Sequence, residues 1–166
     1  METKKESINM STTRRQPDRV SDLEEHLGFW LRYVSNHVSE GFIKRLDAHG
    51  ISGTEWVALR TLYGRSTTTH STLIKALGMT KGAASKVITR LERKGLAHRR
   101  PVEVDGREQQ LELTTEGMNL VPTLAALADE NDAHFFGHLS QEERAALIAQ
   151  MKDIVNRRML KQIPTK

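Results

Sequence analysis

The sequence predicts a mainly α-helical fold that contains one small β-hairpin. Apolar residues recur at intervals of three and four over most of the chain, as they do on one face of an amphipathic helix. Two such patterns meet at a short turn around Gly78, which is the arrangement of a helix-turn-helix unit. Apolar and polar residues then alternate on both sides of Asp105 and Gly106, a dipeptide that strongly indicates a hairpin. A hairpin directly behind a helix-turn-helix is a wing, so the predicted fold class is a winged helix-turn-helix flanked by longer helices.

Composition excludes several kinds of protein. The chain carries 25 Lys and Arg against 21 Asp and Glu, giving a net charge of +4 and a sequence pI near 9.5. This bias is moderate, so the position of the positive charge matters more than its sum. The absence of Cys excludes disulfides, thiolate metal sites and Cys nucleophiles. No window approaches the ~20 apolar residues of a membrane helix, and no signal-peptide pattern is present, so we expect a cytoplasmic protein.

The first 50 residues divide into an arm and a long helix. Residues 1–21 are polar, include Pro17 and lack apolar periodicity, which predicts a flexible or disordered arm. A basic arm that contacts DNA phosphates is the alternative. Residues 22–50 carry apolar side chains at helical spacing from Leu23 to Phe42. The apolar face of this helix is too wide for a helix that stands alone.

Three short helices are predicted before the hairpin. Ser52 and Glu55 form a capping box, in which Ser accepts from free N–H groups of the first turn while Glu reaches back. Residues 65–69 are predicted to be a loop, and Thr80 is the expected N-cap of the third helix. The buried stripe of this third helix is expected to be Ala84, Val87, Ile88 and Leu91. Helix ends are expected at Gly64, Gly78 and Gly95.

Two longer helices follow the hairpin in residues 115–166. The first begins after Thr114, and Pro122 is expected to bend it. Ser140 and Glu143 form a second capping box that opens the final helix. We expect the apolar residues of the final helix to lie inside, namely Leu147, Ile148, Met151, Ile154, Val155 and Met159.

Positive charge concentrates in the third short helix and the strand behind it. Between residues 79 and 100 Glu92 is the sole acid, against the basic residues Lys81, Lys86, Arg90, Arg93, Lys94, Arg99 and Arg100. The recognition helix of a helix-turn-helix enters the major groove of DNA and presents its N-terminal residues to base edges. A solvated basic helix face is the simpler alternative, but the turn and the hairpin favour DNA binding. We expect DNA contacts from Thr80, Lys81, Gly82, Ala83, Ser85, Lys86, Thr89, Arg90 and Arg99.

The tip of the hairpin offers one more candidate contact. Arg107 follows Asp105 and Gly106, and a lone Arg can enter the narrow, negative minor groove of A·T-rich DNA. Asp105 is repelled by phosphate, but it can orient a nearby Arg through a charge-assisted hydrogen bond. The alternative is a turn-forming Asp-Gly pair with a solvated Arg.

These segments together resemble the MarR family of winged-helix transcription regulators, over residues 22–160. The resemblance rests on GISGTEWVALRTL with its capped turn and Trp, LGMTKGAASKVITRLERKGLAHRR as the recognition helix and first wing strand, DGREQQLELTTEG as the wing tip and return to helix, and LSQEERAALIAQM as the final helix. The family's wing motif Asp-x-Arg falls on Asp105 and Arg107. Gly106 stands where many members carry a second Arg, so minor-groove affinity is expected to depend more heavily on Arg107.

The resemblance implies a homodimer and an operator. Residues 22–50 and 115–166 would be the dimerisation helices, which explains their excess of apolar surface, and residues 51–114 would bind DNA. The operator would be pseudo-palindromic, with half-sites about 10 base pairs apart. The resemblance further implies a repressor that a small aromatic or anionic effector releases from DNA, activation being the less common mode.

Other functions remain as alternatives. Trp30, Tyr33 and His37 are the expected effector contacts, because Tyr33 and His37 offer polar atoms on a mostly apolar helix, whereas Trp56 is expected in the core. His134 and His138 have the spacing of metal ligands, but no third ligand lies nearby, so no metal or other cofactor is expected. An architectural DNA-binding protein without an effector is the main rival. A helical small-molecule-binding protein or an enzyme is less favoured, because the sequence lacks a phosphate loop and a nucleophile elbow.

Overall fold

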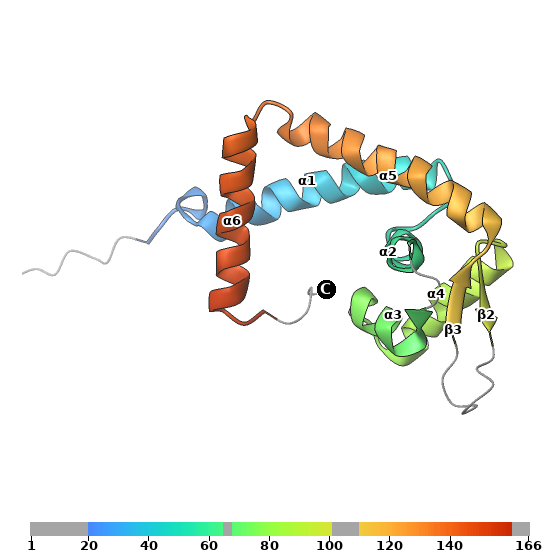
Figure 1. The fold of residues 1–166 in the computed structure, drawn as a ribbon. Helices are drawn as coiled ribbons and strands as arrows, with labels where there is room; N and C mark the ends of the chain where they lie inside the picture. The colour runs from blue at the N-terminus through green and yellow to red at the C-terminus, as the bar shows by residue number, and fades with distance from the viewer. Residues whose placement is uncertain (1–19, 65–67, 101–109, 161–166) are drawn as a thin grey trace, which may run out of the picture. The chain divides into compact units, whose positions relative to one another are not determined.

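The computed structural model describes residues 20–64, 68–100 and 110–160. Its elements are η1 (Leu23–Glu25), α1 (Leu27–Asp47), α2 (Gly53–Leu62), β1 (Thr68–Thr69), α3 (His70–Leu77), α4 (Lys81–Arg93), β2 (Ala97–Arg100), β3 (Gln110–Leu113), α5 (Thr115–Phe136) and α6 (Gln141–Arg157) (Figure 1). The predicted fold class, mainly helical with a small sheet, is confirmed. The chain divides into two units, Met1–Ser35 and Asn36–Lys166, with the division inside α1.

Helix starts follow the capping signals of the sequence. The Ser52 hydroxyl accepts from the Glu55 N–H at 3.3 Å, and the Glu55 carboxylate accepts from the Ser52 N–H at 2.8 Å. Ser140 and Glu143 repeat this reciprocal pair at the start of α6. Thr80 caps α4 by accepting from the Ala83 N–H. Both predicted capping boxes and the predicted Thr80 cap are therefore confirmed.

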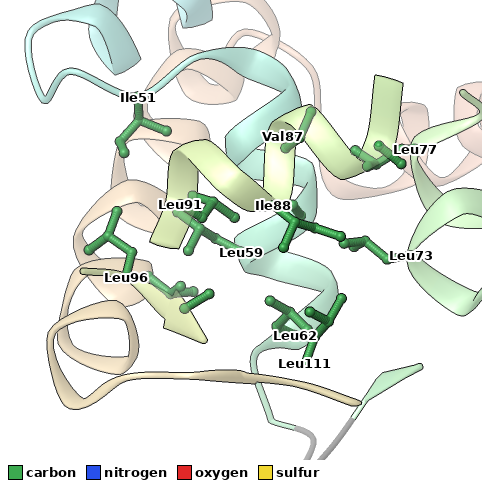
Figure 2. Close-up of a cluster of buried hydrophobic side chains, with 14 of the residues drawn as sticks. Ile51, Leu59, Leu62, Leu73, Leu77, Val87, Ile88, Leu91, Leu96 and Leu111 are labelled. Atoms are coloured by element: carbon green, nitrogen blue, oxygen red, sulfur yellow. The ribbon is translucent and has the colours of Figure 1, made fainter. Parts of the chain in front are cut away.

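The core of the second unit lies between α2, α3, α4, α5 and the sheet. The predicted stripe of α4 is buried, with Ala84, Val87, Ile88 and Leu91 each at most 2% exposed. Figure 2 shows side chains of this cluster converging from the surrounding elements, among them Leu59, Leu73 and Leu111. Trp56 is half-buried against this core and meets Phe42 edge-on, with ring centroids 5.9 Å apart. The prediction that Trp56 is a core residue is confirmed.

The sheet contains the predicted hairpin strands and one strand that was not predicted. β2 and β3 pair antiparallel, with Ala97 opposite Leu113 and Arg100 opposite Gln110. β1 pairs with the other edge of β3, so the strand order is β1-β3-β2. The prediction of a loop over residues 65–69 is wrong at Thr68–Thr69, because these residues gain their hydrogen bonds from β3, which is distant in sequence. Residues 65–67 and the hairpin tip lie outside the described residues.

Glycines end the short helices as expected. Gly64, Gly78 and Gly95 have φ values of 74°, 61° and 69°, the left-handed conformation that favours glycine at a helix end. Gly117, in the first turns of α5, is needed for a different reason. A Cβ at this position would lie 2.1 Å from the carbonyl oxygen of Leu96, the residue before β2. The start of α5 can therefore approach Leu96 this closely only because residue 117 has no side chain.

The two long C-terminal helices differ in how much of their surface is buried. α5 runs through Pro122 and packs on the second half of α1, where Asn131 Nδ2 donates to the Val38 carbonyl at 3.1 Å. The bend expected at Pro122 stays a prediction. In α6 no residue is buried, which corrects the expectation that its apolar residues lie inside the chain. They are 37–46% exposed, and Met159 is 76% exposed, so this stripe lacks a cover within the described residues of the second unit.

The first unit consists of η1 and the beginning of α1. The predicted single helix is divided at His26, whose backbone is extended. Trp30 Nε1 donates to the Glu24 carbonyl at 2.9 Å, which ties the helix to η1. Phe29, Trp30 and Tyr33 contact one another, with ring centroids 5.2–6.2 Å apart. Leu27 and Val34 on the same segment are largely exposed, at 66% and 43%.

Candidate functional site

The helix-turn-helix places α4 with one face in the core and the other outside. Gly78 adopts the left-handed conformation and Thr80 caps the next helix, so α3 and α4 are joined by residues 78–80. Because the apolar stripe of α4 is buried, the intervening residues must point outward. A shallow hollow of about 360 Å³ lies on this outer face. It is lined by Ser85, Lys86, Thr89, Arg90 and Arg93.

The candidate DNA contacts on α4 share this outward face. Lys81, Gly82, Lys86 and Arg90 are exposed, and Ala83, Ser85 and Thr89 are partly exposed. Nothing lies within 4 Å of a Cβ built on Gly82, so the backbone is open to approach there. Among the ion pairs formed by described residues, none involves Lys81, Lys86 or Arg93. Their charges are thus available to an anionic partner.

Other basic residues of the same region are paired inside the protein. Lys94 donates to both oxygens of the buried Glu55 carboxylate at 2.8 Å and to the Gly50 carbonyl at 2.6 Å. Arg90 lies 3.5 Å from the same carboxylate. Burial alone would raise the pKa of Glu55, but the hydrogen bonds from Lys94 and Ser52 and the Lys94 charge outweigh it and lower the pKa. This group therefore fastens the end of α4 to the start of α2.

Arg99, a predicted DNA contact, is held at the base of the wing. It donates to Glu92 at 2.5 Å and to the Thr89 hydroxyl at 3.3 Å. Its neighbour Arg100 pairs with Glu112 on β3. A count of basic residues treats every Arg and Lys as equivalent. Successive side chains of a strand point to opposite faces, however, so Arg99 points toward α4 and Arg100 points away from it. Asp105 and Arg107, the predicted wing contacts, lie outside the described residues.

His70 is a site residue that sequence reasoning missed. It is the first residue of α3, and its Nε2 lies 3.2 Å from the Ser85 hydroxyl of α4. Burial lowers the pKa of His70, and the charges of Lys81 and Arg99 lower it further, so the neutral ring is favoured. A helix-start His has no special sequence signal, and only the packing of α3 on α4 brings it to Ser85.

The predicted effector contacts are divided between the two units. Trp30 and Tyr33 belong to the first unit, where they are 44% and 52% exposed and contact each other edge-on. His37 is placed at the start of the second unit. An effector site at these residues stays a prediction.

Metal clusters and membrane spans are both absent among the described residues. There, no group of three or more His, Asp or Glu side chains is arranged to hold a metal ion. In the same ranges, every helix is too short or too polar to span a bilayer.

The arrangement of α3, α4 and the sheet defines the class of this protein. α4 keeps its apolar stripe inside and exposes Lys81, Lys86 and Arg90, and the wing strands follow it in the chain, which is the architecture of winged helix-turn-helix transcription regulators. The family model described as "MarR family" matches residues 49–108. Over this segment the chain is similar to the MarR family of transcription regulators.

Individual relatives agree with this assignment. The transcriptional regulator SarZ of Staphylococcus haemolyticus is 26% identical over 136 residues, which cover 82% of this chain and 91% of SarZ. The solved Staphylococcus aureus MepR–DNA complex has a TM-score of 0.71 at 25% identity, covering 80% of this chain and 98% of MepR. Bordetella bronchiseptica BpsR, whose DNA binding is regulated by 6-hydroxynicotinic acid, has the same fold, with a TM-score of 0.72 at 21% identity over 82% and 97% of the two chains.

Proposed function

We propose that this protein binds a pseudo-palindromic operator as a homodimer, represses transcription and is released by a small aromatic or anionic effector. The outer face of α4 is the observation that carries this proposal. It combines the cations Lys86, Arg90 and Arg93 with the hydroxyl-bearing residues Ser85 and Thr89 around the hollow, on a helix whose apolar stripe is buried in the core. Such a surface can neutralise phosphates and approach base edges at the same time.

In the proposed complex, the N-terminal half of α4 enters the major groove. Lys81 lies at the start of α4, whose free N–H groups also favour a phosphate. Gly82 and Ala83 allow close approach of the backbone, and Ser85 and Lys86 reach base edges. Arg90 and Arg93 lie further along the helix and suit phosphates at the groove wall. Arg107 of the wing is assigned to the adjacent minor groove from the sequence alone.

A second copy of the chain is the proposed cover for the apolar surfaces. On α6 the exposed side chains Leu147, Ile148, Met151, Ile154 and Val155 form one stripe. On the first unit Leu27, Trp30, Leu31 and Val34 are likewise exposed. Apolar stripes on this scale indicate a protein interface, and a symmetric dimer matches two operator half-sites. This assigns residues 22–50 and 115–166 to dimerisation and residues 51–114 to DNA. A chromosomal operator would place the dimer in the cytoplasm.

Effector release is proposed by comparison with BpsR, which responds to an aromatic acid. Trp30, Tyr33 and His37 remain the candidate contacts from the sequence. An architectural DNA-binding protein without an effector is the second candidate, favoured by the cations of α4 that can bind any phosphate backbone.

Selection of bound duplexes from a random DNA pool at near-physiological salt tests the proposal. A regulator should enrich one two-fold symmetric site. Affinity for that site is then measured with 6-hydroxynicotinic acid or a related aromatic acid added, and an effector should lower it. Binding without enrichment would favour the architectural protein. A failure to bind DNA at all would contradict both.

A further inference from the structure

Two hydroxyl groups on the outer face of α4 are each held by a side chain from another element. Ser85 and Thr89 are one helical turn apart, so they point the same way, and both line the hollow. The Ser85 hydroxyl forms a hydrogen bond with Nε2 of His70 in α3, at 3.2 Å. Thr89 accepts from Arg99 of β2, at 3.3 Å. Arg99 is itself fixed by the ion pair with Glu92 at 2.5 Å.

We propose that Ser85 and Thr89 read the operator as a pair of oriented hydroxyls, and that His70 and Arg99 are positioning residues that set which base edges these hydroxyls recognise. This inference rests on the proposed function, because it assigns roles within the same DNA-binding face. It adds specificity determinants that lie outside the recognition helix.

The physical basis is the dual character of a hydroxyl. A freely rotating hydroxyl can donate or accept, so it discriminates poorly between base edges. A guanidinium has only donors, so the Thr89 oxygen accepts from Arg99 and the Thr89 proton points away from it. That proton suits an acceptor in the major groove, such as guanine O6 or N7, adenine N7 or thymine O4.

His70 orders Ser85 in the same manner. The Ser85 hydroxyl either donates to Nε2 or accepts from it, and the opposite role, as acceptor or donor, is then left for a base edge of the DNA. His70 is partly buried and begins α3, so its ring is anchored independently of α4. Side chains fixed before binding lose less entropy in the complex, which sharpens discrimination between bases.

The test measures base preference rather than affinity alone. The selected operator and its single-base-pair variants are titrated with the full-length wild-type protein and with Ser85→Ala, His70→Ala, Thr89→Val and Arg99→Lys. Ser85→Ala and His70→Ala should reduce discrimination, by up to about tenfold, at the same symmetry-related base pair. Thr89→Val and Arg99→Lys should each reduce discrimination at a second base pair, which should be the same for both variants. The double variant Ser85→Ala/His70→Ala should match Ser85→Ala, since both changes remove one interaction.

Matched controls and a conservative variant separate positioning from folding. His49→Gln changes an exposed His outside the site, and Arg100→Lys changes the neighbour of Arg99 that pairs with Glu112, so both should keep the wild-type profile. His70→Gln, which can still reach Ser85, should restore discrimination lost in His70→Ala. Uniform loss of affinity on every variant duplex, or changes at unrelated base pairs, would overturn the positioning roles while leaving the proposed function intact. If the wild-type protein enriches no site, the proposed function and this inference both fail.

Discussion

Lys94 donates to both carboxylate oxygens of Glu55, at 2.8 Å each, and so joins the last turn of the recognition helix to the first turn of α2. The side chain of Glu55 is 2% exposed and that of Lys94 is 36% exposed. The same carboxylate also accepts from the Ser52 N–H. One buried acid therefore serves both as the helix cap of α2 and as an ion-pair partner that joins α4 to α2.

Glu55→Gln should destabilise the fold. The amide can still accept from Ser52, but it leaves the Lys94 ammonium without its charged partner, a loss of about 2 kcal/mol. Urea denaturation at neutral pH measures the change in the free energy of unfolding. Glu40→Gln is the matched control, because Glu40 pairs with Lys44 on the surface at 60% exposure, and this substitution should leave the free energy of unfolding almost unchanged. Equal effects of the two substitutions would contradict the role of burial.

The same pair predicts a pH dependence. The pKa of Glu55 is lowered in the folded protein from its ordinary value of 4.5, so the folded state holds the carboxylate more strongly than the unfolded state does. The resulting stability is fully present above 4.5 and is lost as pH falls through the folded-state pKa. The difference in unfolding free energy between wild type and Glu55→Gln should therefore shrink as the pH is lowered below 4.5 and through the folded-state pKa of Glu55. A difference that stays constant over this range would assign the effect to packing.

Two glycines should respond oppositely to the same substitution. Gly117→Ala places a Cβ 2.1 Å from the Leu96 carbonyl, so α5 must shift, at a cost of about 1–3 kcal/mol. Gly82→Ala meets nothing within 4 Å and lies within α4, so it should stabilise the fold by roughly 0.5–1 kcal/mol. Operator affinity of Gly82→Ala should nevertheless fall, because the added methyl separates α4 from the groove. Thermal unfolding and DNA titration on both variants measure this contrast, and unchanged DNA affinity in Gly82→Ala would remove Gly82 from the interface.

The α6 stripe should control the oligomeric state. Ile154→Glu puts a charge in the centre of the exposed apolar stripe, so the dimer should dissociate and operator binding should weaken. Light scattering during size-exclusion chromatography measures the mass directly. Ala149→Glu, on the opposite face of α6, is the control and should stay dimeric. A dimeric Ile154→Glu variant would move the interface away from this stripe.

Local signals made much of this architecture predictable from the sequence. Ser52, Thr80 and Ser140 cap their helices through hydrogen bonds within four residues, and the α4 stripe follows helical spacing alone. The strand at Thr68 was missed because its partner Leu111 is distant in sequence. Packing likewise decides which cations are paired.

The candidate site shows the same division. Lys86 and Lys94 are equivalent in composition, yet one is exposed on the outer face and the other is paired with Glu55. His70 reaches Ser85 only through the packing of α3 on α4. Side-chain roles at the interface thus require three-dimensional neighbours that periodicity does not specify.

Lys86 and Arg93 should separate base reading from phosphate binding. Both line the outer hollow, but Lys86 lies in the N-terminal half of α4 and Arg93 is its last residue. Lys86→Ala should therefore relax sequence preference more than it weakens binding to random DNA. Arg93→Ala should weaken binding to all sequences alike and lower the slope of log affinity against log salt by about one. Titrations of operator and random duplexes at several salt concentrations measure both effects, and equal losses on all sequences for Lys86→Ala would reassign Lys86 to a phosphate contact.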